Sequence, residues 1–138
     1  MSYWRIFYHL IWATKRRESL LDERVEAMVY GTILNKAKEL GIIVHAIGGR
    51  EDHLHVVATI PPKMAVAEGV RQLKGASSHY VNLQCDGEQR FSWQDSYGVL
   101  TLGERSMPDV VKYVKNQRQH HDAGTTIPIF ERTDESET

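Results

Sequence analysis

Residues 50–60 read Arg-Glu-Asp-His-Leu-His-Val-Val-Ala-Thr-Ile and form the clearest strand pattern of the chain. Successive side chains of a β-strand point to opposite faces of the sheet. His53 and His55 therefore share one face, while Leu54 and Val56 share the other. The apolar face indicates packing against a core. The two imidazoles on the opposite face are spaced so that both can bind one metal ion.

The segments before this stretch predict one helix between two strands. Residues 3–14 alternate between two largely apolar faces, which favours a central strand. Asp22 is a suitable N-cap for an apolar helical stripe that ends at Gly41. A second strand is expected over residues 42–47. A turn at Gly48-Gly49 would then lead into the strand His53–Ile60.

The segments that follow predict a second helix and a fourth strand. Pro61-Pro62 ends the histidine strand, because proline cannot donate a ladder hydrogen bond. A helix is expected from about Met64 to Leu83, and a strand from Tyr97 to Leu102. The resulting order β-α-β-β-α-β predicts an α+β, ferredoxin-like fold, an antiparallel sheet with helices on one face.

A further C-terminal helix is additional to that arrangement. Ser106-Met-Pro-Asp109 reads as a capping box with proline in the first turn, and Gly124 lies just past the expected end. Val110 and Val114 belong to an apolar stripe. A separate polar face carries four side chains, namely Tyr113, Asn116, Gln117 and His120.

Length and composition indicate one domain of 138 residues. We expect a single domain over residues 1–130 and an acidic, disordered tail over residues 131–138. The single cysteine excludes an intrachain disulfide framework. The N-terminus lacks signal-peptide features and no apolar run is long enough for a membrane helix, so a cytoplasmic protein without membrane contact is the simplest interpretation.

The histidine pair and Tyr113 are the candidate chemical groups. Neutral imidazoles suit Zn, Mn, Fe or Ni, and a carboxamide or carboxylate oxygen can complete the ligand set. Tyr113 and Gln117 are i and i+4 on one helix, so they are presented together. A phenol near a metal can attack a phosphodiester. The alternatives are two histidines on a half-exposed strand and a tyrosine ring packed between helix and sheet. His120 is a spare ligand or base.

Basic residues gather in two places although the net charge is −1. Lys15, Arg16 and Arg17 are consecutive, and Arg71 and Lys74 lie one helical turn apart. Local clusters determine phosphate contact more than total charge does, so these residues are candidate DNA contacts. A solvated surface is the alternative.

The chain resembles the single-tyrosine HUH transposases of the IS200-like insertion sequences, in which HUH denotes histidine, a bulky apolar residue and histidine. The resemblance rests on five segments that occur in the same order as in that family and cover most of residues 3–121. They are Tyr8–Lys15, Asp52–Pro62, Leu73–Ser78, Trp93–Gly98 and Tyr113–Gln117.

The resemblance implies a metal-dependent transposase of single-stranded or hairpin DNA. His53, His55 and Gln117 would bind Mg²⁺ or Mn²⁺, and Tyr113 would form a covalent 5′-phosphotyrosine link. The family also implies a homodimer whose active sites are shared between protomers. Two other functions stay open: a domesticated, cleavage-inactive regulator that binds hairpin DNA, and a ferredoxin-like dimer that binds a small ligand.

Overall fold

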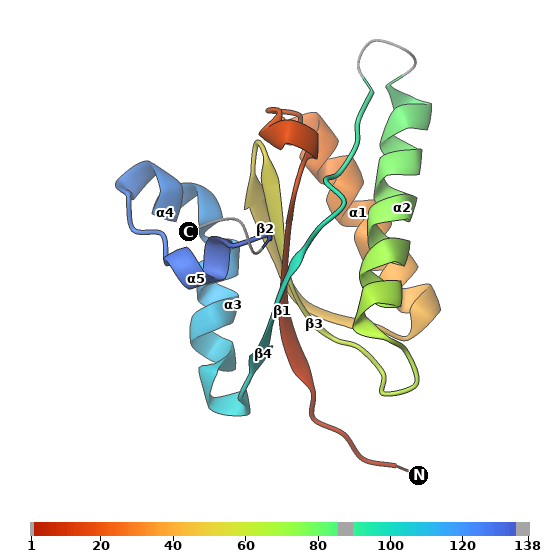
Figure 1. Ribbon diagram of the computed structural model, residues 1–138, viewed down its shortest axis with the longest axis vertical. Coiled ribbons are helices and arrows are strands. Elements are labelled where there is room, and N and C mark those ends of the chain that lie inside the picture. The colour runs from red at the N-terminus through yellow and green to blue at the C-terminus, as the bar shows by residue number, and fades with distance from the viewer. Residues whose placement is uncertain (1, 86–89, 135–138) are drawn as a thin grey trace.

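A four-stranded antiparallel sheet lies at the centre of the protein, in a computed structural model that describes residues 2–85 and 90–134. Its strands, in the order β2-β3-β1-β4, are β1 (Phe7–Ala13), β2 (Ile43–Arg50), β3 (His53–Thr59) and β4 (Gly98–Leu102). One face is covered by α1 (Glu23–Leu40) and α2 (Val66–Gln84). The other carries α3 (Met107–Lys115), α4 (Gln117–Ala123) and α5 (Pro128–Glu131) (Figure 1). This arrangement confirms the predicted ferredoxin-like α+β fold.

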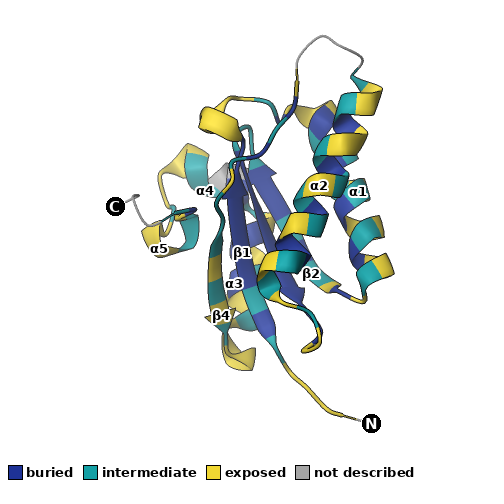
Figure 2. Cartoon of the chain, turned by 45° about the vertical axis from the view of Figure 1, so that its right-hand side comes forward, coloured by how far each residue is buried: buried dark blue, intermediate teal, exposed yellow. Residues whose placement is uncertain are grey.

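The two faces of the central strands separate the main core from the histidines. Leu10 and Trp12 of β1 pack with Leu54 and Val56 of β3 in the large core beneath α1 and α2. Figure 2 shows this burial along the central strands. His53 and His55 lie on the opposite face of β3, as the strand periodicity predicts, beside a smaller cluster formed with α3.

The ends of α1 follow from its terminal residues. The Asp22 side chain accepts a hydrogen bond of 2.9 Å from the backbone N–H of Val25. Gly41 has φ +76°, a left-handed conformation that suits glycine, and its N–H bonds to helix carbonyls. Both predicted boundaries are confirmed.

The predicted turn at Gly48-Gly49 is wrong, because both glycines belong to β2. Gly48 pairs with His55 and Gly49 with Leu54, and the chain turns at Glu51–Asp52. The glycines instead allow close backbone approach. A Cβ on Gly48 would lie 2.0 Å from the carbonyl oxygen of Val114, so the absence of a side chain lets α3 lie directly on β2.

We expect Gly48→Ala to destabilise the protein by about 2–3 kcal/mol, because the added methyl group forces α3 away from the sheet. Gly31→Ala is the matched control. Gly31 lies inside α1 and a Cβ there meets nothing within 4 Å, so alanine should stabilise by about 0.5–1 kcal/mol. Chemical denaturation of both variants measures this difference. Equal stability of the two would contradict the close approach of α3.

The C-terminal helix differs from its prediction in two respects. Ser106 has helical φ and ψ and makes no side-chain capping bond, so the predicted capping box does not form. A short 3₁₀ turn, Glu104–Ser106, precedes α3 instead. The helix also breaks at Asn116, with φ −104° and ψ 28°, and continues as α4 until Gly124. The break places Gln117 at the start of a new helix.

The folded part of the chain extends past the predicted boundary at residue 130. Glu131 is the last residue of α5, and Thr133 is fully buried. The acidic composition of residues 131–138 therefore did not indicate where the fold ends. Residues 135–138 of that predicted tail lie outside the described residues.

β1 is also shorter than the predicted strand over residues 3–14. Its partners β3 and β4 pair with it only between Phe7 and Ala13, so the residues before Phe7 lack a strand to join. Among the described residues, no helix combines the length and the apolar character needed to cross a membrane.

Candidate active site

The two histidines of β3 direct one ring nitrogen each toward a common carboxylate. The Nε2 atoms of His53 and His55 lie 3.1 Å and 3.2 Å from Oε1 of Glu131. Both imidazoles are buried, and Glu131 comes from α5 on the same face of the sheet. The ligand atoms of all three residues lie within 4.8 Å of one another. Two imidazole nitrogens and one carboxylate oxygen form a donor set that suits Mn²⁺, Fe²⁺ or Zn²⁺.

The remaining nitrogen of each imidazole has its own partner. Asp52 Oδ1 lies 2.7 Å from Nδ1 of His53, and Nε2 of His9 lies 2.8 Å from Nδ1 of His55. Each Nε2 that faces Glu131 is therefore backed by a hydrogen bond on the other side of its ring. Such partners orient imidazole ligands in metal sites.

Two further side chains approach the pair from α4. Oε1 of Gln117 lies 3.2 Å from Nε2 of His53, and Gln117 is almost fully buried. His121, one turn later, places its Nε2 3.1 Å from the same nitrogen of His53 and 3.2 Å from Glu131. Gln117 thus lies beside His53, and its role as the third ligand stays a prediction.

Burial and neighbouring charges shift the pKa values of the site residues in different directions. Burial disfavours a charged His53, but hydrogen bonds and charges from Asp52 and Glu131 outweigh it and raise the pKa of His53 to about 9. Burial lowers the pKa of His55 below its ordinary value. Burial also opposes a charged Glu131, yet its hydrogen bonds to the histidines and to Tyr113 hold its pKa well below the usual range. The anionic Glu131 carboxylate therefore attracts positive charge, which a protonated His53 supplies in this structure.

Tyr113 lies against the same cluster from the last turns of α3. Its hydroxyl donates a hydrogen bond of 2.5 Å to Oε2 of Glu131 and accepts one of 2.9 Å from the N–H of Ile127. The ring is only 4% exposed and packs edge-on against His55 and Phe130. Burial, together with the bond to Glu131, raises the pKa of Tyr113 to about 12. The phenol is therefore neutral and is linked through Glu131 to the histidine pair, although it is buried rather than on a polar surface as predicted.

His120 contacts Tyr113 but not the ligand cluster. Its ring stacks on that of Tyr113 with centroids 4.6 Å apart, and its Nδ1 lies 2.9 Å from the hydroxyl of Thr125. The structure therefore places the predicted auxiliary residue beside the phenol ring. Its role as a ligand or base stays a prediction.

Four residues of the site were missed by the sequence analysis: Asp52, Glu131, His121 and His9. Glu131 was assigned to the tail from its acidic surroundings. His121 lies four residues after Gln117, so helical spacing was an available signal. His9 shares the inward periodicity of the first strand, but nothing local marks it as different from an ordinary core residue.

The predicted DNA contacts occupy two separate surfaces. Lys15, Arg16 and Arg17 form an exposed 3₁₀ turn after β1, and Arg17 lies 3.8 Å from Asp52, the partner of His53. Arg16 and Arg17 both adopt left-handed φ values, 57° and 54°. This basic turn therefore borders the candidate site.

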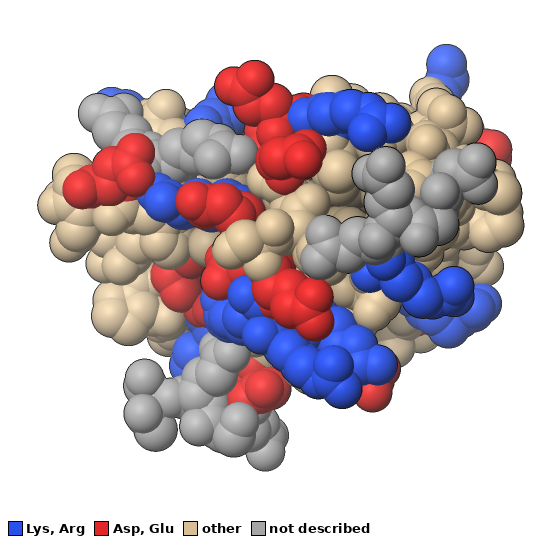
Figure 3. Space-filling view, turned by 90° about the horizontal axis from the view of Figure 1, so that it is seen from above, with Lys and Arg blue, Asp and Glu red and all other residues tan. Residues whose placement is uncertain are grey.

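The second basic group lies on α2. Arg71 pairs with Glu68 at 2.6 Å, and the Lys74 ammonium donates to the carbonyl of Gln94 at 2.5 Å. Lys74 thus fixes the segment before β4 as well as carrying charge. Figure 3 shows basic and acidic side chains interspersed on the end of the molecule that it views. Contact of either basic group with DNA stays a prediction.

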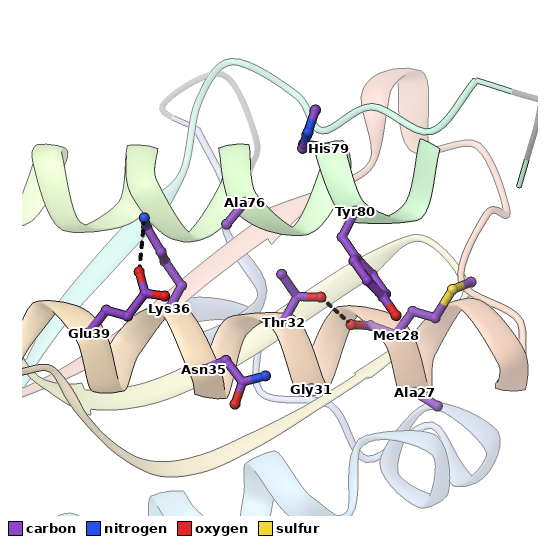
Figure 4. A pocket seen from close by; sticks show the side chains of 10 residues that line it. All are labelled: Ala27, Met28, Gly31, Thr32, Asn35, Lys36, Glu39, Ala76, His79 and Tyr80. Carbon is purple, nitrogen blue, oxygen red and sulfur yellow. Dashed lines mark hydrogen bonds and ion pairs between the residues drawn. The ribbon is translucent and has the colours of Figure 1, made fainter. Parts of the chain in front are cut away.

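A groove on the outer side of α1 and α2 lies far from this chemistry. It has a volume of about 720 Å³ and is lined by small and polar side chains, among them Gly31, Asn35, His79 and Tyr80 (Figure 4). Its hydrogen bonds, such as Thr32 to the Met28 carbonyl, are internal to α1. The sheet separates this groove from the histidine pair, so the groove is not the active site.

One face of the ferredoxin-like sheet thus brings a His-x-His pair of a central strand and a tyrosine of a packed helix to the same carboxylate. Residues 2–117 match the family described as Transposase IS200 like. The chain therefore belongs to the IS200-like transposase family, as its resemblance to that family predicts.

Individual relatives agree with this assignment. The chain is 29% identical to the ISDra2 transposase TnpA of Deinococcus radiodurans, over 83% of this chain and 85% of that protein. It is 30% identical to the transposase for insertion sequence element IS200 of Salmonella typhimurium, over 91% of this chain and 86% of the relative.

Solved structures share the fold. A transposase crystal structure from Deinococcus radiodurans superposes with a TM-score of 0.69 and 28% identity, covering 85% of this chain and 95% of that one. The structure of a REP-associated tyrosine transposase bound to a REP hairpin superposes with a TM-score of 0.64 and 17% identity, covering 94% of this chain and 78% of that one.

Proposed function

We propose that this transposase cleaves and rejoins single-stranded DNA through a covalent 5′-phosphotyrosine at Tyr113. The observation that carries the proposal is the shared Glu131 carboxylate, which bonds the Tyr113 hydroxyl through one oxygen and faces His53 and His55 through the other. The proposed nucleophile and the proposed metal-binding nitrogens therefore contact one carboxylate. A nucleophile of this kind needs a nearby proton acceptor and stabilisation of phosphate charge.

The chemical step consists of one bond formed and one bond broken at phosphorus. The Tyr113 oxygen bonds to the phosphorus, and the bond from phosphorus to the 3′-oxygen breaks. The DNA then carries a free 3′-OH on one side and a 5′-phosphotyrosine on the other, and a second 3′-OH can reverse the step. The phenolic proton leaves along its hydrogen bond to Glu131 and passes on to water, since the low pKa of Glu131 prevents the carboxylate from keeping it, and water protonates the leaving 3′-oxygen.

A divalent cation, Mg²⁺ or Mn²⁺, fits the donor atoms that the site offers. His53 and His55 would hold it through Nε2, with an oxygen of Gln117 or Glu131 completing the protein ligands. When bound, such an ion polarises the scissile phosphate and neutralises its developing charge. The imidazoles are fixed by Asp52 and His9, so the donor atoms stay in place without the ion.

The adduct itself provides the direct test. Protein mixed with hairpin oligonucleotides from the DNA flanking its gene, in the presence of Mn²⁺, should form a protein–DNA band that survives denaturing electrophoresis. Excess chelator should remove at least about 99% of it, since the cation is proposed to neutralise the charge that develops on the scissile phosphate, and added Mn²⁺ should restore it. An adduct that forms equally well in chelator would rule out the metal-dependent mechanism.

A cleavage-inactive regulator of hairpin DNA is the second candidate function. It is favoured by the burial of Tyr113, whose hydroxyl is already occupied by Glu131 and the N–H of Ile127. The adduct experiment separates the two functions, since a regulator would bind hairpin DNA under the same conditions and leave no covalent band.

We infer that the DNA partner is single-stranded or hairpin DNA and that the basic turn of Lys15, Arg16 and Arg17 contacts its phosphates. The support is the exposure of this turn and its position beside Asp52 at the edge of the site. A related solved transposase is bound to a REP hairpin, which favours the same class of ligand.

Neutralising Arg16 and Arg17 to Gln should weaken hairpin binding and flatten its salt dependence. Each phosphate contact on a single strand contributes a slope of roughly −0.7 in log affinity against log salt, so two lost contacts change the slope by about 1.4. Lys36→Gln with Lys38→Gln on α1 removes the same charge from the far side of the sheet and is the control. Equal slopes for the two double variants would exclude the basic turn from the interface.

We also propose that the chain acts as a homodimer whose active sites are shared between protomers. Within one chain, Gln117 contacts His53 and Tyr113 packs against His55. Exchange of α3 and α4 between two protomers would reproduce the same contacts in each site, because the surfaces involved are identical. The residues Gly103–Ser106 before α3 form the connection at which such an exchange would occur.

A further inference from the structure

We propose that His9 is a positioning residue that holds His55 with Nε2 directed at the metal and lets that nitrogen give up its proton. The proposal rests on the metal role proposed above for His55. It concerns a residue of β1 that lies 46 positions earlier in the chain and does not itself face the donor cluster.

The contact between the two rings is close and fully enclosed. His9 Nε2 lies 2.8 Å from His55 Nδ1, and neither residue is exposed. The rings are tilted by 32° with centroids 5.1 Å apart, and Phe130 packs edge-on against His9 from α5. His9 pairs in register with Val57 of β3, so the strand pairing itself fixes the distance to His55.

Hydrogen-bond chemistry gives this contact a definite consequence. A neutral imidazole has one N–H and one lone pair, so fixing one nitrogen determines the other. For Nε2 of His55 to donate a lone pair, its proton must lie on Nδ1 and be donated to Nε2 of His9. The proton of His9 then lies on Nδ1. With the protons reversed, Nε2 of His55 donates to Glu131 at 3.2 Å, and the bond between the two imidazoles is kept.

Nδ1 of His9, the nitrogen that faces away from His55, indicates that packing alone does not account for a histidine at this position. Among the described residues, Nδ1 of His9 is one of the buried side-chain atoms that have no hydrogen-bond partner. Leaving such an atom unpaired is unfavourable, and an apolar side chain of similar size would avoid it. We therefore attribute the histidine at this position to its Nε2, which forms the hydrogen bond with His55.

The same face of the sheet offers a parallel case at His53. There the partner of Nδ1 is the Asp52 carboxylate, which can only accept. His9 differs because its Nε2 can either donate or accept. The pair His9–His55 can thus keep its hydrogen bond both with and without a cation, whereas the pair Asp52–His53 favours one arrangement.

The first experiment measures Mn²⁺ affinity of the DNA-free protein. His9→Leu, which keeps the volume but has no acceptor, should bind Mn²⁺ about ten- to a hundred-fold more weakly. His9→Gln can still donate or accept near Nε2 and should stay within about threefold of wild type. Ile11→Val changes packing opposite His55 without touching its polar partner, so it is the matched control and should also bind normally.

The outcomes separate this inference from the proposed metal role. If wild type binds Mn²⁺ and His9→Leu binds it equally well, the positioning role is overturned while the metal role stands. If His9→Leu and His9→Gln bind Mn²⁺ equally weakly, the affinity depends on the shape of the imidazole and the hydrogen-bond argument fails. If wild type does not bind Mn²⁺, both proposals fall.

A second measurement uses the wild-type protein only, so it does not depend on whether a variant folds. Nitrogen-15 NMR of the wild-type imidazoles, with Zn²⁺ as a diamagnetic probe, reports which nitrogen of each ring carries its proton. Zinc-loaded protein should show His55 and His9 both protonated on Nδ1. A protonated Nε2 on His9 in the zinc-loaded protein would overturn the proposal.

Discussion

Tyr113→Phe should leave no detectable covalent DNA adduct, a loss of at least about a thousand-fold, because it removes the attacking oxygen and nothing else. The phenyl ring keeps its packing against His55, His120 and Phe130. The variant does lose the hydrogen bonds of the hydroxyl, which contribute about 1 kcal/mol each, so its folding should be verified by circular dichroism.

The control for this substitution is Tyr80→Phe. Tyr80 also loses a hydroxyl, but it lines the groove between α1 and α2, on the far side of the sheet from the histidines. Its adduct should match wild type in amount and in metal dependence. If the Tyr113→Phe protein still forms the adduct, the nucleophile is a different residue.

Mixing His55→Ala with Tyr113→Phe should restore covalent adduct if the active sites are shared between protomers. Each variant alone has a lesion in every site and should show no adduct. In a mixed dimer with exchanged α3 and α4, one site combines both lesions and the other combines two intact halves. With random pairing about half of the dimers are mixed and one site in two is intact, so about a quarter of wild-type adduct is expected.

Absence of adduct in the mixture would indicate that each site is built within one chain. If each site uses residues of one chain only, as the contacts within the single chain permit, no site in the mixture is intact and no adduct appears. Tagged copies of the two variants and a pull-down establish that mixed dimers are present. Absence of adduct in proven mixed dimers would reject shared sites and leave the nucleophile assignment untouched.

The parts of this site that local periodicity controls could be predicted from the sequence. Strand alternation alone places His53 and His55 on one face, and helical spacing brings Gln117 near Tyr113. The structure has both arrangements. The element order likewise predicted the sheet topology, since short connections leave few ways to arrange these strands.

The parts that depend on tertiary contact could not be predicted in this way. Glu131 lies 76 residues from His55 and reaches it only because α5 returns to the sheet. Gly48 and Gly49 suggest a turn when considered alone, but the α3 backbone approaches Gly48 closely and the β3 backbone at His53 approaches Gly49. The burial of Tyr113 depends on Phe130 and Ile127, which no helical pattern connects to it.

The positive φ angles of Arg16 and Arg17 in the basic turn set the thermal stability of the protein against its affinity for a ligand. Arg16 and Arg17 both hold positive φ values, which are unfavourable for residues with a Cβ and cost of order 1 kcal/mol or more each. Glycine would adopt these angles without strain. A selection for heat resistance would therefore favour glycine at these positions, and the same change would remove two cations from the rim of the site. Under the phosphate contacts proposed for this turn, variants of the protein selected for heat resistance should therefore bind DNA more weakly.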